Sequence, residues 1–254
     1  MTISTERRGD VLVVTMTDHE RRNALSVQLV ADTIKAIQES RVEGVRAIVL
    51  MSASTVFSAG ADLAAMNKES SNNRTAPPGS PFELFEALTK ETRPVIAAVN
   101  GGAYGGGFEL TLCCDAIVAS SKAFFVLPEL GHGVLPNTAL ARLPALIGVA
   151  RAKALAFTRR KLSANEAQQM GLVHVVIEPE GLEDAAVALA DSIVASAPPT
   201  GIAAAKAEFE RWIGVDWTWA RSGRSRSNPE ERKEGTTAFL EKRAPDYERF
   251  WRAQ

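Results

Sequence analysis

Two glutamates in apolar surroundings are the residues of this chain best suited to chemistry. Glu109 comes just after the glycine-dense stretch 101–107, and Glu129 follows Pro128 at the end of an apolar run. Burying a carboxylate among apolar neighbours costs free energy unless the group is paired or hydrated, so an unpaired one suggests a functional role. Each glutamate taken alone is more often a structural or surface residue, but the two together favour general acid–base work. Burial and mutual repulsion raise at least one pKa of such a pair, which leaves an acid beside a base.

The glycine-dense stretch could suggest a phosphate-binding loop, but its spacing does not match. A dinucleotide-binding fingerprint on Gly105 and Gly107 needs a glycine at position 110, where Leu110 stands. A P-loop on Gly101 and Gly106 needs a lysine at position 107, which is also glycine. Nicotinamide cofactors and nucleotide hydrolysis are therefore disfavoured.

The same stretch favours the binding of a developing negative charge. The helical pattern that begins near Gly106 has free backbone N–H groups in its first turn, and these carry partial positive charge. A second turn, residues 58–62, also follows a buried strand, so the two turns can direct two N–H groups at one oxygen. The alternative is that the glycines only permit close packing of helix and strand. Asp62 has a structural explanation as a helix cap.

Other reactive side chains give weaker signals. His132 lies three residues after Glu129 without an evident partner, which favours a structural or rim position, and His19 and His174 are isolated. No spacing of His, Cys and Asp resembles a metal site. The Gly-x-Ser-x-Gly elbow of serine hydrolases is absent from the sequence.

The elements around these residues alternate between strand and helix. This alternation predicts an α/β fold in which helices cover mostly parallel strands. The break at Ala197-Pro198-Pro199 divides an α/β part, residues 1–196, from a helical part, residues 197–254, which would serve as a cap or an oligomerisation module. We expect strands at 11–16, 46–51 and 172–177, in the apolar run 94–100, in a segment that ends at Ser120, and at 123–129, where the strand ends in a proline and a carboxylate. We expect helices from near 25 to near 44 and at 82–92, 148–159, 163–170, 181–196, 200–213 and 236–243.

Composition restricts the class of protein. The chain has 254 residues, of which 46% are apolar and 23% charged, as in ordinary soluble domains. A net charge of −1 gives no electrostatic argument for nucleic acid or an anionic membrane. Cys113 and Cys114 are adjacent, which favours a reducing compartment. With no signal-like segment and no long apolar run, we expect a cytoplasmic protein.

Several segments together resemble the crotonase (enoyl-CoA hydratase/isomerase) superfamily. They are Arg22-Asn23-Ala24-Leu25, residues 57–63, residues 98–110, Leu127-Pro128-Glu129 and the tail from Glu234 to Arg243. The resemblance covers nearly the whole chain in the family's order and spacing. It implies a crotonase-like spiral of ββα repeats, with a C-terminal helical region used in trimer formation. It also implies an acyl-CoA thioester substrate, with coenzyme A as part of that substrate and no further cofactor or metal.

The resemblance assigns roles to particular residues. The backbone N–H groups of Ala61 and Gly106 match the oxyanion hole, which holds the thioester oxygen. Glu109 and Glu129 match the two glutamates of the hydratase subgroup, in which Glu109 activates a water for C3 and Glu129 protonates C2. Substrate or CoA contacts are implied for Arg22, Ala59, Gly60, Asp62, Leu63, Phe239 and Lys242. Phe239 and Lys242 match tail positions that contact CoA from a neighbouring subunit in relatives, but ordinary helix amphipathicity explains them equally well. Arg22 could meet the phosphates of CoA or be a solvated turn residue.

Hydration of a 2-enoyl-CoA is therefore the expected reaction, in a homotrimer or a dimer of trimers. The alternatives are another crotonase reaction, such as Δ3–Δ2 isomerisation of an enoyl-CoA, and a non-catalytic acyl-CoA-binding subunit. Two departures from the hydratase pattern bear on this choice. Leu127 stands where a polar residue is common, and Asn137-Thr138-Ala139 replaces an expected glycine-rich segment, so both would reshape the pocket beside Glu129.

Overall fold

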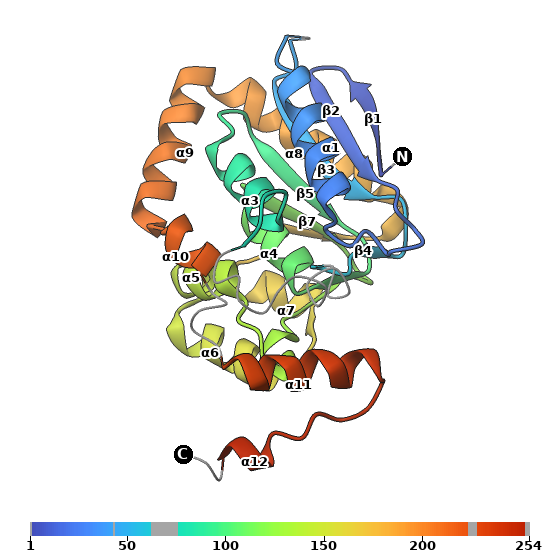
Figure 1. Cartoon of the computed structure of the whole chain (residues 1–254). Coiled ribbons are helices and arrows are strands. Elements are labelled where there is room, and N and C mark those ends of the chain that lie inside the picture. Colours follow the sequence, from blue (N-terminus) through green and yellow to red (C-terminus); the bar gives the residue numbers. More distant parts are fainter. Residues whose placement is uncertain (1, 43, 62–75, 223–227, 252–254) are drawn as a thin grey trace.

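Two β-sheets organise the polypeptide, whose computed structural model describes residues 2–42, 44–61, 76–222 and 228–251 (Figure 1). The larger sheet contains, in spatial order, β1 (Ile3–Arg8), β2 (Val11–Met16), β3 (Ala47–Ser52), β5 (Val95–Val99), β7 (Ala116–Ser120) and β10 (Val175–Ile177). The smaller sheet contains β4 (Val56–Ser58), β6 (Gly102–Tyr104), β8 (Phe124–Val126) and β9 (Leu162–Ser163). Strands pair in parallel except at β1–β2 and β8–β9.

The central strands of the larger sheet are each followed by a strand of the smaller sheet. β3 leads to β4, β5 leads to β6, and β7 leads to β8. Helical structure then returns the chain to the larger sheet, as in the succession β5, β6, α4 and β7. The expected spiral of ββα repeats is confirmed.

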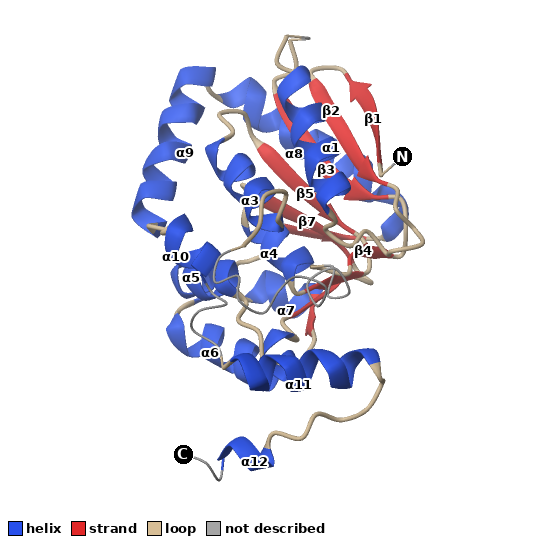
Figure 2. Ribbon diagram, in the orientation of Figure 1, coloured by secondary structure: helices blue, strands red, loops and turns tan. Residues whose placement is uncertain are grey.

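Helices surround both sheets (Figure 2). Their starts follow local chemistry, since the Ser26 side chain caps α1 by accepting from Leu29 N, and a capping box between Ser163 and Glu166 begins α7. The helices are α1 (Val27–Glu39), α3 (Pro81–Lys90), α4 (Gly106–Leu112), η1 (Glu129–His132), α5 (Asn137–Ile147), α6 (Val149–Thr158), α7 (Ala164–Gln169), η2 (Pro179–Gly181), α8 (Leu182–Ser196), α9 (Pro199–Ile213), α10 (Trp217–Arg221), α11 (Pro229–Leu240) and α12 (Glu248–Trp251).

The larger sheet is buried on both faces, which explains its nearly continuous apolar strands. Along β2, Val11 and Val13 belong to the cluster beneath α8, whereas Leu12, Val14 and Met16 belong to the cluster shared with α1, α3 and α4. The alternation follows from the two-residue period of a strand. The sheet is thereby fixed between two layers, and its carboxyl ends are directed toward the smaller sheet.

Some element boundaries differ from the sequence prediction. α11 begins at Pro229, not near residue 236, because Asn228 caps the helix by accepting from Glu230 N and Pro229 fits its first position. A strand, β6, lies inside the glycine-dense turn, since pairing with β4 and β8 outweighs the low strand propensity of its glycine. The sequence pattern of residues 130–144 predicts loop and short helix; in the structure η1 ends at His132 and the longer helix α5 runs from Asn137 to Ile147.

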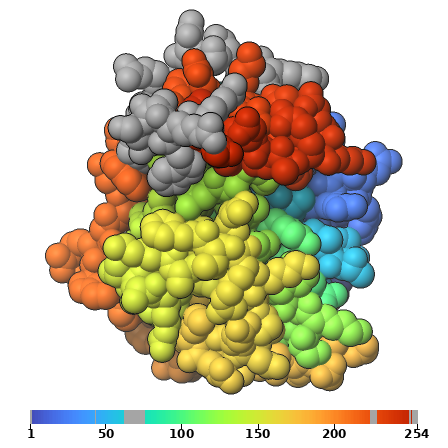
Figure 3. Space-filling view, turned by 90° about the horizontal axis from the view of Figure 1, so that it is seen from below, coloured from blue at the N-terminus to red at the C-terminus, as the bar shows by residue number. Residues whose placement is uncertain are grey.

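The C-terminal segment crosses the lower part of the molecule. α11 packs on η1, and Tyr247 Oη donates to Gly131 O at 3.1 Å. Figure 3 shows this segment, in red, against the green and yellow surface of the middle of the chain. The division of the chain into two parts at residue 197 stays a prediction. α11 belongs to the second part and packs on η1, the short helix that begins with Glu129.

No single helix among the described residues has both the length and the apolar composition to cross a bilayer; Pro179–Ser196 and Pro199–Ile213 meet that test only as a pair bent by 108°. Cys113 and Cys114 are free thiols.

Candidate active site

Two turns meet at the carboxyl ends of neighbouring parallel strands. β4 pairs with β6, with Ser58 opposite Ala103, so the residues that follow each strand arrive at the same edge. A Cβ added to Gly106 would lie 3.2 Å from Ala61 N, and one added to Gly60 would lie 2.4 Å from Tyr104 O. Such contacts leave room for glycine alone at position 60, where φ is +85°. The backbones of the two predicted oxyanion turns therefore touch.

Both expected N–H donors border one cavity. Ala61 and Gly106 line it, and Gly106 is the first residue of α4, whose N–H has no acceptor within the helix. Two converging N–H groups can stabilise an oxygen that gains negative charge. Their position agrees with an oxyanion hole, whose role stays a prediction.

Glu109 is buried but has donors. It lies on the first turn of α4 at 7% exposure, and its Oε1 accepts a hydrogen bond from Ala139 N at 2.9 Å. Burial raises the pKa of Glu109 to about 7, while the backbone N–H groups of Ala139 and Thr138 act in the opposite direction. Both donors belong to the first turn of α5, where the helix carries partial positive charge. These groups stabilise the ionised form of Glu109.

Glu129 has a different environment. It begins η1, and a Cβ on Gly105 would lie 2.4 Å from its Oε1, so this oxygen packs against the glycine backbone. Its Oε2 is buried and has no hydrogen-bond partner in the described part of the chain. Burial, and after it the negative charge of Glu109, raises the pKa of Glu129 well above its usual range. The two carboxyl groups therefore differ: backbone N–H donors favour the ionised form of Glu109, whereas burial favours the protonated form of Glu129.

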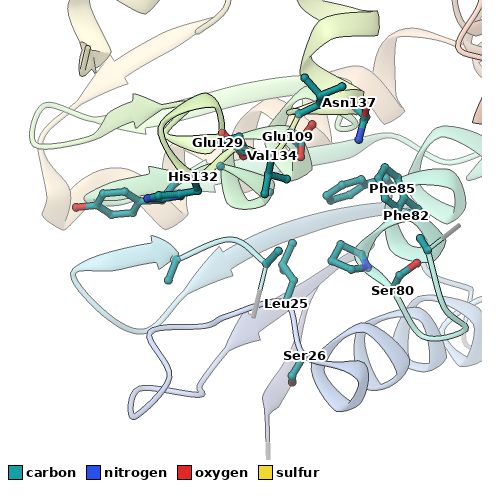
Figure 4. Close-up of a pocket in the computed structure, with 18 of the residues that line it drawn as sticks. Leu25, Ser26, Ser80, Phe82, Phe85, Glu109, Glu129, His132, Val134 and Asn137 are labelled. Carbon is teal, nitrogen blue, oxygen red and sulfur yellow. The ribbon is translucent and has the colours of Figure 1, made fainter. Parts of the chain in front are cut away.

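The two carboxylates face a cavity of about 520 Å³ (Figure 4). Figure 4 shows Glu109 and Glu129 in the same region of its wall, with Phe82, Phe85 and Asn137 to one side of Glu109. The phenyl rings of Phe82 and Phe85 meet edge to face, with 6.0 Å between the ring centroids. This side of the cavity is therefore predominantly apolar, with Asn137 as a polar group at its border.

Most residues expected to contact substrate lie at this cavity. Arg22, Ala59 and Phe239 line it, in addition to Ala61, Gly106, Glu109 and Glu129. Gly60 lies in the turn between Ala59 and Ala61, whereas Asp62 and Leu63 lie outside the described residues. Lys242 is exposed just beyond α11 and does not border the cavity. Phe239 reaches the cavity of its own chain, because α11 packs on η1.

Sequence reasoning did not assign cavity contacts to several other residues. Arg232 lines the cavity from α11, and His132 lines it from η1, where its ring meets Phe239 edge-on at 4.8 Å. Burial and nearby Arg159 lower the pKa of His132. The spacing of His132 from Glu129 was a usable signal for its place at the rim. Within the described residues, no group of three or more His, Cys, Asp or Glu side chains could hold a metal ion.

A family profile matches nearly the whole chain. The profile of the enoyl-CoA hydratase/isomerase family aligns with residues 6–250. The chain belongs to this family. The crotonase resemblance seen in its turns and glutamates is thereby confirmed. The expected enzyme class is confirmed as well, since two relatives described below, an enoyl-CoA hydratase and a carnitinyl-CoA dehydratase, are hydro-lyases.

Individual relatives are similar over nearly their full length. A short-chain-enoyl-CoA hydratase of Clostridium acetobutylicum is 34% identical over 255 residues, covering 94% of each chain. A carnitinyl-CoA dehydratase of Salmonella typhi is 36% identical over 251 residues, and the match covers 94% of the present chain and 95% of the dehydratase. Among solved structures, a methylmalonyl-CoA decarboxylase in complex with 2-nitronate-propionyl-CoA superimposes with a TM-score of 0.86 at 27% identity, covering 97% of this chain and 98% of its own.

Proposed function

We propose that this chain adds water across the double bond of a 2-enoyl-CoA thioester, and catalyses the reverse dehydration. The observation that carries the proposal is the unequal environment of the two carboxylates, since Glu109 accepts from Ala139 N and Glu129 Oε2 has no described partner. Hydration needs one group that takes a proton from water and one that delivers a proton to carbon. A base and an acid facing one cavity supply both functions.

Two proton transfers bring about the proposed hydration. Ionised Glu109 removes a proton from water as the water oxygen bonds to C3, and the C2–C3 π electrons move to give an enolate. The thioester oxygen of the enolate is held by the N–H groups of Ala61 and Gly106. Protonated Glu129 then delivers its proton to C2. The product contains one added water, and proton exchange returns Glu109 to its ionised and Glu129 to its protonated form.

The thioester is proposed to enter between α11 and the 22–25 turn. Arg22 and Arg232 place two guanidinium groups at the cavity wall, which suits the phosphates of coenzyme A. Phe82 and Phe85 then face the acyl group, which favours an apolar acyl substituent. The coenzyme is part of the substrate, and the proposed steps use side chains and backbone alone.

Mass spectrometry tests the proposal directly. A panel of 2-enoyl-CoA and 3-enoyl-CoA thioesters of increasing acyl length is incubated with the protein, and hydration is scored as the gain of one water. We expect hydration of 2-enoyl thioesters, and a loss of about 100-fold or more in kcat for Glu129→Gln and Glu109→Gln. Glu180→Gln, an exposed glutamate on η2, is the matched control. Unchanged turnover in Glu129→Gln contradicts the assignment.

Double-bond isomerisation is the second candidate reaction. It is favoured by the lack of a described partner for Glu129 Oε2, because one carboxyl can shuttle a proton between two carbons of the substrate. Products of unchanged mass from 3-enoyl thioesters, with activity retained in Glu109→Ala, would support it. Tight binding of CoA esters without any product would instead indicate an acyl-CoA-binding subunit.

We also propose that the chain assembles as a homotrimer or a dimer of trimers. Phe209 and Trp212 on α9 are 68% and 72% exposed, and Leu146 beside them is 41% exposed. Exposed apolar side chains that gather on one face commonly mark an interface. Light scattering after size-exclusion chromatography gives the oligomeric mass, and a monomer in solution contradicts this proposal.

A further inference from the structure

The turn at residues 22–25 holds the first oxyanion turn from outside. Ala59 N donates to Arg22 O at 2.9 Å, and Leu25 N donates to Gly60 O at 2.8 Å. These two bonds join the backbones immediately before Ala61, which carries the proposed donor N–H. The position of that N–H therefore depends on the shape of the 22–25 turn.

Asn23 determines the shape of this turn. Its φ is +52°, a region that asparagine tolerates better than most residues, and the residue is fully buried. Its Nδ2 donates to Ser52 Oγ at 2.7 Å and to Phe57 O at 3.1 Å, so it binds the end of β3 and the middle of β4. The side chain thus fixes the turn to both strands that lead into the oxyanion hole.

Ser58 completes the link from the other side. Its Oγ donates to Asn23 O at 2.7 Å and accepts from Gly60 N at 3.1 Å. A Cβ on Gly107 would lie 2.6 Å from Ser58 O, so this residue also touches the helix whose first N–H belongs to Gly106. Asn23 and Ser58 therefore connect both halves of the site.

We propose that Asn23 and Ser58 are positioning residues, which hold the N–H of Ala61 at the spacing from the N–H of Gly106 that a thioester oxygen requires. Neither side chain borders the cavity, so both act through the backbone of residues 59–61. The inference rests on the proposed function in one respect, namely that these two N–H groups bind the thioester oxygen.

The carbonyl stretch of a bound thioester reports this spacing without turnover. Infrared difference spectra of butanoyl-CoA, with and without ¹³C at the carbonyl, give the stretch free and bound. We expect the wild type to lower the frequency, because two N–H donors polarise the bond. We expect Asn23→Gly, which keeps the positive φ accessible, and Ser58→Ala to return it toward the free value. Where 2-enoyl-CoA is turned over, kcat falls about 10- to 100-fold in both variants, with a smaller change in the affinity for butanoyl-CoA.

Ser40→Ala is the matched control. Ser40 is 2% exposed, and its Oγ donates to Ile37 O at 2.8 Å and accepts from Arg93 Nη1 at 3.0 Å, so it makes one donated and one accepted bond as Ser58 does. It lies at the end of α1, and we expect its variant to lose stability without changing the carbonyl frequency.

The outcomes separate the two proposals. A folded Ser58→Ala with the wild-type carbonyl frequency overturns the inference, and this variant decides the matter where Asn23→Gly does not fold. A wild type that leaves the frequency unshifted overturns the oxyanion hole and this inference together. A shift that is lost in the variants, in a protein that hydrates no enoyl thioester, supports the inference and contradicts the proposed function.

Discussion

Replacing Gly105 by alanine would place a methyl group against the proposed acid. Gly105 is the N-cap of α4, with φ +51° and ψ −118°, and its added Cβ would lie 2.4 Å from Glu129 Oε1. Relief of this contact requires the carboxyl group to move by about 1 Å, since carbon and oxygen atoms are not found so close together. The substitution therefore moves Glu129 while leaving its chemistry unchanged.

Two effects follow, with separate magnitudes. A non-glycine residue in this backbone region costs about 1–3 kcal/mol, which lowers the melting temperature of a chain of this size by about 2–4 °C per kcal/mol. A displacement of about 1 Å in a catalytic group can cost about 100-fold in rate, equivalent to about 2.7 kcal/mol of activation free energy. Since stabilities of about 5–15 kcal/mol are usual, the variant remains folded at 25 °C and the rate loss is not due to unfolding.

Gly148→Ala provides the control for Gly105→Ala. Gly148 is the N-cap of α6 with φ +82° and ψ 151°, so alanine is strained there too, but its Cβ would meet no atom within 4 Å. The loss of ultraviolet absorbance of a 2-enoyl thioester gives kcat, and thermal unfolding gives the melting temperature. We expect similar losses of stability in the two variants and a large loss of kcat in Gly105→Ala alone. Equal kcat values in the two folded variants would refute the placement of Glu129.

Three further predictions follow from charges on the described residues. The rate of hydration should rise through about pH 7 as Glu109 ionises and fall at higher pH as Glu129 does; a flat profile through pH 7 contradicts the assignment. Glu109 binds its proton more tightly in the folded than in the unfolded chain, so its ionisation destabilises the fold from about pH 4.5 upward and fully above pH 7. Glu109→Gln should therefore raise the free energy of unfolding by about 3 kcal/mol at pH 8 but leave it unchanged at pH 4, as urea titrations at the two pH values can measure. Arg142 is 3% exposed, donates to Leu112 O at 2.7 Å and pairs with Glu210 through both Nη atoms. Arg142→Ala should therefore lower the free energy of unfolding, measured in urea, by about 3 kcal/mol, because it leaves the Glu210 carboxylate without its partner. The double variant Arg142→Met with Glu210→Met should recover most of this loss.

The order of elements could be predicted from the sequence because it depends on local patterns. Apolar runs at 11–16, 46–51 and 94–99 are long enough to indicate buried strands, and they are β2, β3 and β5. The two predicted oxyanion turns could also be located from the sequence, since each follows a strand and contains glycine. The contact between the two turns could not be predicted, because it depends on the pairing of β4 with β6. β6 is stabilised as a strand by pairing with β4 and β8 more than by the strand propensity of its own residues.

The sequence placed both glutamates near the glycine-containing turns, and both line the same cavity, but the difference between their environments could not be predicted. The donor to Glu109 is the backbone N–H of Ala139, thirty residues away, and a backbone donor has no signature in side-chain type. Asn137-Thr138-Ala139 was expected only to reshape the pocket floor. In the structure Asn137 borders the cavity, and Thr138 and Ala139 supply the N–H groups that favour the ionised form of Glu109.

The two glutamates differ because backbone hydrogen-bond donors reach Glu109, whereas Glu129 Oε2 has no partner among the described residues. Glu109 on α4 meets the first turn of α5, which presents N–H groups and the positive end of a helix. Glu129 packs against Gly105, which has no side chain to donate, and its Oε2 has no hydrogen-bond partner among the described residues. Two carboxyl groups of the same chemical type thereby have unequal environments, which is the basis for the proposed roles of Glu109 as proton acceptor and Glu129 as proton donor.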